Sequence, residues 1–171
     1  MDLSVIINSV ISLFLIILVG IYGSKRNIIT GEINKGLTNL LLEITLPAMI
    51  IVSFIFDMNE EVKNNIIKCF YYSPIVILIT IIVSYLLLLP LKSDKKVIIQ
   101  FANVFSNCGF IGFPVIISIF GAEGVIYASI FNMYFTIFLW TYGVLLYTGK
   151  VSFKDIKKVI LNPSIIAVVI G

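Results

Sequence analysis

Four residues near the middle of the chain carry its strongest chemical signal: Asn107, Gly109, Gly112 and Pro114. They interrupt an apolar run that would otherwise form one unbroken helix. Proline lacks a backbone N–H, and glycine permits conformations that other residues avoid. A new helix that starts at such a break has free N–H groups and a positive dipole end, which bind an anion without a basic side chain. Asn107 adds a side-chain amide that both donates and accepts hydrogen bonds.

The first helix is expected to end near Cys108 and the next to start near Phe113, with Pro114 in its first turn. Counted from Ile98 at about 1.5 Å per residue, Asn107 lies roughly 14 Å into the apolar run, near its middle. The four residues therefore predict an anion-binding site at mid-depth in a membrane. The alternative is a proline kink with small packing residues, which is common in transmembrane helices.

Apolar helices must position this site. The chain has 171 residues, of which 60% are hydrophobic and 12% are charged, and its mean hydropathy is +1.11. This composition indicates an integral membrane protein. Runs of about 20 apolar residues, enough to cross a bilayer, are predicted at 3–23, 36–56, 69–91, 98–120 and 125–147, and a sixth begins near Val159. We therefore expect an all-α integral membrane fold with five complete transmembrane helices plus the start of a sixth, and with the fourth span broken at the Gly/Pro crossover.

The distribution of basic residues predicts the orientation in the membrane. Loops 24–35, 92–97 and 148–158 carry three, three and four Lys or Arg residues, and the other loops carry two in total. By the positive-inside rule these three loops are cytoplasmic, which places the N-terminus outside the cell membrane. The net charge is only +3, and no basic block lies near aromatic residues, so the sequence gives no sign of nucleic-acid binding.

Glu43 is the only acidic residue well inside a predicted span. Ionisable residues at depth are costly and often functional, so Glu43 is a candidate for proton coupling. The alternative is that its side chain lies roughly 10 Å from the cytoplasmic end and reaches water or a loop lysine. Asn132 and Thr136 are expected to bond to a neighbouring helix, and Asn162-Pro163 is expected to begin the sixth helix.

The remaining residue types argue against catalysis. The two cysteines, Cys69 and Cys108, are expected to be small apolar fillers. The chain has no His, and the sequence predicts neither a metal site nor a cofactor. A membrane-embedded enzyme needs a nucleophile with a base, a pair of carboxylates or a metal, so we expect no enzyme. A non-transporting membrane scaffold or subunit remains an alternative to a carrier.

The break belongs to a longer pattern of short segments. These are the residues from Phe105 to Pro114, those from Phe120 to Gly124, Tyr127-Ala128, Leu46-Pro47-Ala48 and Asn162-Pro163. In these segments the chain resembles the auxin efflux carrier family of bacterial and plant membrane transporters, which includes the plant PIN proteins. The segment from Phe105 to Pro114 is the most specific of them.

This resemblance implies an inverted-repeat transporter, with two five-span repeats whose broken helices cross at the site for a small organic anion such as a carboxylate. Asn107 and Pro114 match the family residues that line this site. The chain would then hold the first repeat at 1–158 and the start of the second at 159–171, so we expect a fragment that needs a second five-helix repeat. A second copy is a candidate partner, forming a homo-oligomer, although the charge bias favours one orientation whereas an inverted repeat needs two.

Overall fold

The computed structural model describes residues 3–55, 59–92, 95–150 and 152–171, and within these ranges every regular element is helical. The α-helices are α1 (Leu3–Lys25), α2 (Gly31–Leu40), α3 (Leu46–Ser53), α4 (Glu60–Leu87), α5 (Lys96–Val104), α6 (Phe113–Phe138), α7 (Val144–Thr148), α8 (Phe153–Ile160) and α9 (Pro163–Ile170). Wide π turns continue some of them: η1 (Leu41–Thr45), η2 (Cys108–Gly112) and η3 (Leu139–Gly143). The described part of the chain is therefore all-α, as predicted.

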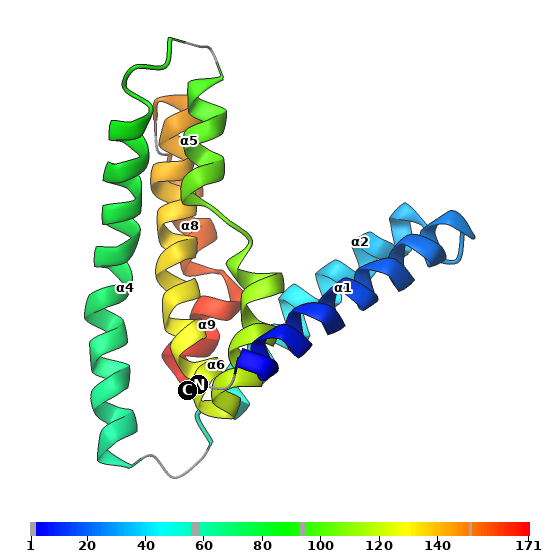
Figure 1. Cartoon of the computed structure of the whole chain (residues 1–171). Coiled ribbons are helices and arrows are strands. Elements are labelled where there is room, and N and C mark those ends of the chain that lie inside the picture. The colour runs from blue at the N-terminus through cyan, green and yellow to red at the C-terminus, as the bar shows by residue number, and fades with distance from the viewer. Residues whose placement is uncertain (1–2, 56–58, 93–94, 151) are drawn as a thin grey trace.

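Four helical stretches are long and apolar enough to cross a membrane: Ser4–Lys25, Gly31–Ser53, Glu60–Leu87 and Lys96–Thr148. The last has 53 residues, about twice the length that one crossing needs. It turns back at Gly121, where φ is 62° and ψ is −146°, a conformation essentially reserved for glycine. Figure 1 shows the chain running from α5 to this turn in α6 and back to α7. The predicted fourth and fifth runs lie on the two arms of this stretch.

Some helices extend beyond the predicted apolar runs because polar residues cap them. α4 begins at Glu60, well before the run predicted from 69. The Asn59 side chain accepts a hydrogen bond from the N–H of Val62 at 2.8 Å, and Lys63 forms an ion pair with Glu60 at 2.8 Å. Both contacts favour a helix in water. The predicted end of the second run at 56, and positions 93, 94 and 151 of the predicted loops, lie outside the described residues.

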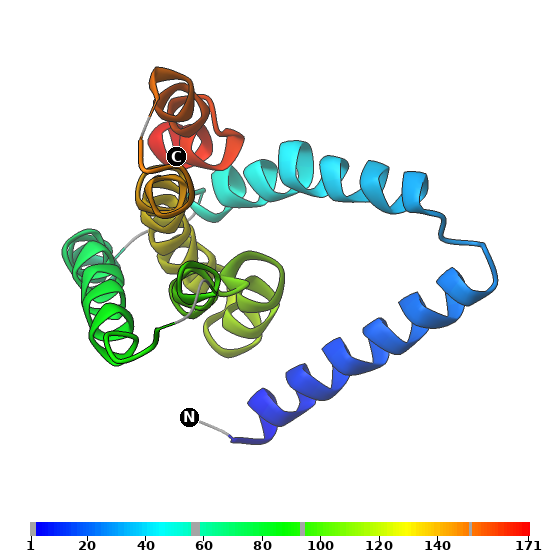
Figure 2. The same cartoon turned by 90° about the horizontal axis from the view of Figure 1, so that it is seen from above.

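The helices form a bundle with one projecting arm. α1 and α2 extend away from the other helices in Figure 1. Seen from above, these two helices form a V, and η2 and the start of α6 lie between them (Figure 2). α1 is largely exposed along its length, with Val19 at 69% and Ile16 at 66%. Exposed apolar helices of this kind are suited to contact with lipid or with other transmembrane helices.

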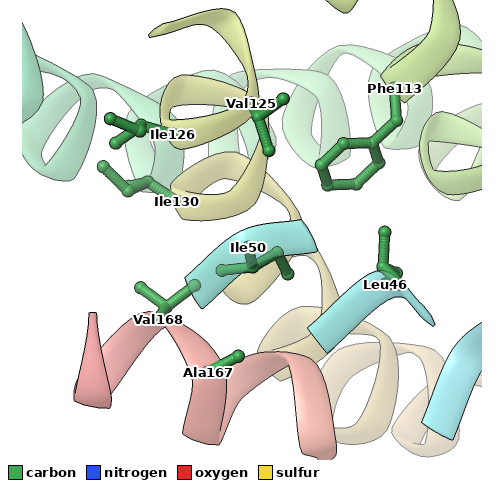
Figure 3. Packing of buried hydrophobic residues seen from close by; sticks show 8 residues of the cluster. All are labelled: Leu46, Ile50, Phe113, Val125, Ile126, Ile130, Ala167 and Val168. Atoms are coloured by element: carbon green, nitrogen blue, oxygen red, sulfur yellow. The ribbon is translucent and has the colours of Figure 1, made fainter. Parts of the chain in front are cut away.

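The core lies where α3, α6 and α9 meet (Figure 3). Its buried members are Leu46, Ile50, Phe113, Val125, Ile126, Ile130, Ala167 and Val168. Gly124 allows the two arms of α6 to approach closely, because an added Cβ would lie 2.7 Å from Cγ2 of Ile116. Since α9 contributes buried residues to this core, its first turn is held close to the break.

The sixth apolar run is divided in the structure. Val159, where it was predicted to begin, belongs to α8, and α9 starts only at Pro163. The Asn162 side chain caps α9 by accepting hydrogen bonds from the N–H groups of Ser164 and Ile165 at 3.0 and 3.3 Å. The prediction that Asn162-Pro163 begins a helix is therefore confirmed.

Candidate binding site at the helix break

The break lies at residues 105–107, ahead of both glycines. Asn107 has φ −78° and ψ 71°, and the N–H of Cys108 donates to the carbonyl of Ser106 at 2.9 Å. These values describe an inverse γ-turn. Oδ1 of Asn107 then accepts a hydrogen bond from the N–H of Phe110 at 3.1 Å. Asn107 is therefore the N-cap of the restarted helix.

This geometry corrects the predicted position of the break. The restarted helical stretch begins with η2 at Cys108, whereas α6 itself begins at Phe113 with Pro114 in its first turn, as predicted. The wide turn η2 ends two residues before Pro114, and η1 ends two residues before Pro47. A widened turn accommodates the missing N–H and the ring of proline. The asparagine cap therefore sets the break, while each proline follows a π turn.

A pocket of about 250 Å³ lies beside the break. Residues from η1, the start of α3, the break, η2, the C-terminal part of α6, the start of η3 and the start of α9 form its wall. Its polar side chains are those of Ser106, Asn107, Asn132, Thr136, Asn162 and Ser164. Leucine and phenylalanine side chains make up most of the remaining wall, and none of the described residues lining this pocket is Asp, Glu, Lys or Arg.

Two of the three asparagines use their side-chain oxygens to cap helices. Asn107 caps the restarted helix, and Asn162 caps α9. In both cases backbone N–H groups occupy Oδ1 as donors. These hydrogen bonds identify Oδ1 of each side chain as the atom that faces the helix N–H groups. The other polar group of each side chain is the amide Nδ2, which can only donate hydrogen bonds.

Asn132 is the third asparagine, and it lies on α6 across from the break. Its Oδ1 lies 3.8 Å from Sγ of Cys108, a weak S–H donor, so Asn132 also retains its Nδ2 donor. Thr136 donates its hydroxyl hydrogen to the carbonyl of Asn132 at 2.8 Å, within its own helix and not to a neighbouring helix as predicted. Each of the three asparagines that line the pocket thus keeps an amide donor.

The predicted site residues are distributed over three neighbouring pockets. Asn107 and Gly109 line the pocket of 250 Å³. Gly112 lines a pocket of about 260 Å³ that also contains Asn132, and Pro114 lines one of about 160 Å³. Glu43 is exposed and lines none of these three pockets. Its role in proton coupling stays a prediction.

Five polar residues of the main pocket were not predicted as site residues: Ser106, Asn132, Thr136, Asn162 and Ser164. We expected Asn132 to pack and Asn162 to begin a helix. Their shared signal in the sequence is a polar residue within or at the start of an apolar run, but nothing in the spacing indicates that they meet. Among the described residues, no group of three or more His, Cys, Asp or Glu side chains could hold a metal ion.

Comparisons with known proteins identify the family of the chain. A family model described as membrane transport protein matches residues 5–152. The chain is also 29% identical over 159 residues to an uncharacterized transporter of Methanocaldococcus jannaschii, an alignment that covers 87% of this chain and 50% of that protein. The chain therefore spans about half the length of the curated relative it matches. No solved structure matches the chain.

The family match covers most of the chain and includes the break, η2 and Asn132. It confirms the resemblance found in the sequence. The chain is thus a multi-pass membrane protein that belongs to the membrane transport protein family, which is the auxin efflux carrier family.

Proposed function

We propose that this chain is part of a secondary carrier that moves small organic anions such as carboxylates across the cell membrane, and that the pocket at the break binds the anion. The observation that carries the proposal is the set of three asparagines whose oxygens each accept a hydrogen bond within the protein and whose amide groups remain as donors. An ionised carboxylate offers only acceptors. Hydrogen bonds to such a charged acceptor are roughly twice as strong as those between neutral groups.

The rest of the pocket supports a particular kind of acid. The helix that starts at Cys108 adds its positive dipole end, an effect of up to about 2 kcal/mol at partly buried sites. The leucine and phenylalanine side chains of the wall, among them Leu42 and Phe135, suit an apolar body. We therefore favour acids with one carboxylate and an apolar remainder. The absence of a basic side chain from the pocket suits a site that must also release its ligand.

The proposal includes the membrane topology. The chain crosses the membrane five times with its N-terminus outside, and loops 24–35, 92–97 and 148–158 are cytoplasmic. Residues 1–158 form the first five-helix repeat, and the second repeat starts in 159–171. Support comes from the broken helix itself, since inverted-repeat transporters place their sites at discontinuous helices near the midplane.

A comparison of two ligands of the same shape tests the proposal. Labelled benzoate and its neutral counterpart benzamide are titrated onto the purified protein in lipid nanodiscs. We expect benzoate to bind about tenfold or more tightly, because the N–H₂ group of benzamide would face other donors. Asn107→Ala should weaken the binding of benzoate.

The outcome also separates a carrier from a scaffold. Equal affinity for the two ligands would refute the donor-lined site. If the protein binds neither ligand, nor the aliphatic acids acetate and succinate, the non-transporting scaffold becomes the better account. Uptake of labelled benzoate into vesicles containing the protein then tests transport itself.

A further inference from the structure

We infer that α9 supplies a second half of the anion site, in which the hydroxyl of Ser164 binds the carboxylate directly and Asn162 provides a further amide donor. This inference rests on the proposed function of the pocket. It adds a second binding element, far from the break along the chain.

Ser164 is a buried hydroxyl without a hydrogen-bond partner among the described residues. Its side chain is only 7% exposed, and it lines the pocket at the break. The described residues contain no fully inaccessible side-chain N or O atom that lacks a partner, so Oγ of Ser164 keeps some accessible surface. Ser164 is one of the residues that line the pocket.

Two other buried serines of the bundle, Ser129 and Ser53, have acceptors within their own helices, whereas Ser73 on α4, at 5% exposure, has no side-chain partner among the described residues. Ser129 donates to the carbonyl of Val125 at 2.6 Å, and Ser53 donates to the carbonyl of Ile50 at 2.6 Å. Each uses a carbonyl from the preceding turn of its own helix. Ser164 is the second residue of α9, so no preceding turn of that helix supplies an acceptor. A buried polar group without a partner is costly and calls for an explanation. A ligand in the pocket provides one.

The start of α9 is held in place independently of any ligand. Ala167 and Val168, one turn further along, are 1% and 8% exposed and belong to the core with α3 and α6 (Figure 3). The Asn162 side chain caps the helix from within the same pocket. Two capped helix starts, at Cys108 and Pro163, therefore contribute to one pocket, and each carries a positive dipole end.

A carboxylate has two oxygens, each with room for more than one donor. We assign one oxygen to the donors of the break and of α6, namely Asn107 and Asn132, and the other to Ser164 and Asn162 on α9. An anion bound in this way bridges the broken helix and α9. Its affinity then depends on both elements.

Serine variants test this inference by titration of labelled benzoate onto the purified protein in nanodiscs. Ser164→Ala removes the hydroxyl and is expected to weaken benzoate binding about tenfold or more, the usual effect of losing a hydrogen bond to a charged group. Ser164→Thr keeps a hydroxyl and should retain most of the affinity. The matched control is Ser129→Ala, since Ser129 is also buried, at 1% exposure, but does not line the pocket.

The possible results have distinct meanings. If Ser164→Ala leaves benzoate binding unchanged while Asn107→Ala weakens it, α9 is not part of the site and the proposed function stands. If Ser129→Ala weakens binding as much as Ser164→Ala, or if Ser164→Ala weakens benzoate and benzamide equally, the effect is one of packing and the inference is wrong. If the wild-type protein binds no carboxylate, both proposals fail. Size-exclusion chromatography and thermal unfolding confirm that each variant is folded.

Discussion

Replacing Asn107 with aspartate exchanges a donor for an acceptor while preserving the local fold. Aspartate is as good an N-cap as asparagine, and a carboxylate oxygen can accept the hydrogen bond that Phe110 donates to Oδ1 at 3.1 Å. A negative charge at a helix start is also favourable. We therefore expect Asn107→Asp to unfold at the same temperature as the wild type or slightly above it, and to lose anion binding.

The size of the loss follows from two contributions. Removing a hydrogen bond to a charged group costs about 1.5–3 kcal/mol. Placing two carboxylates about 4 Å apart adds roughly 4 kcal/mol of repulsion at an effective dielectric constant of about 20. Together they predict a loss of affinity on the order of 10⁴- to 10⁵-fold. Asn107→Ala lacks the repulsion, so its loss should be nearer ten- to a hundredfold, roughly, but it should lower the stability by about 1 kcal/mol because the cap is removed.

Titration of labelled benzoate in nanodiscs, at neutral to mildly basic pH, measures the affinities, and thermal unfolding measures the stabilities. The reasoning predicts opposite orders: Asn107→Asp has the weaker binding and Asn107→Ala the lower stability. If the aspartate variant binds benzoate as tightly as the wild type, the donor-lined pocket does not bind the carboxylate. If the alanine variant is as stable as the aspartate variant, the cap does not set the break.

Three further predictions concern Gly124 near the turn in α6, Asp155 in α8 and Glu43. Gly124→Ala places a Cβ 2.7 Å from neighbouring side-chain atoms and should lower the free energy of unfolding by about 1–3 kcal/mol, measured in detergent against Gly36→Ala, where the added Cβ has open space. Hydrogen bonds from the hydroxyl and N–H of Ser152 lower the pKa of the Asp155 carboxyl. The ionised carboxylate therefore stabilises α8 fully at pH values above the ordinary carboxyl pKa. This stabilisation is lost as the pH falls through the lowered pKa of the folded state. Asp155→Asn should remove this dependence, as followed by the NMR shifts of 153–160 during acidification. Glu43→Gln should leave benzoate affinity unchanged, since the side chain lines none of the three pockets. If Glu43 carries the coupled proton, the variant should show a flatter pH dependence of benzoate uptake into vesicles. An unaltered pH dependence would rule out that role.

Much of the architecture could be predicted from the sequence, because a membrane restricts the possible structures. Apolar runs of about 20 residues leave helices as the simplest way to pair every backbone group. The turn between the fourth and fifth runs was predicted at 121–124, and Gly121 has the positive φ that only glycine adopts readily. The pattern from Phe105 to Pro114 also predicted a broken helix next to Asn107 and indicated the family, which the comparison confirms.

The residues at which the helix breaks could not be predicted from the helix-breaking propensity of proline and glycine alone. Proline and glycine disfavour a regular helix, but they do not decide where the chain departs from it. Here the γ-turn at Asn107 and its side-chain cap end the irregular segment at Cys108, and the π turn η2 accommodates Pro114. Local hydrogen bonds therefore moved the helix start several residues toward the N-terminus.

The sequence by itself determined a helical membrane protein with a broken helix in the segment from Asn107 to Pro114, because backbone pairing in lipid and the conformational limits of proline and glycine are local constraints. Only the tertiary structure decided what the break faces. Packing of α9 against α3 and α6 brings Asn162 and Ser164 to the same pocket as Asn107 and Asn132. The side-chain oxygens of the three asparagines accept hydrogen bonds from helix N–H groups or from Cys108, so each asparagine keeps its amide group as a donor. Contacts between distant segments depend on side-chain shape and burial, which no local pattern records.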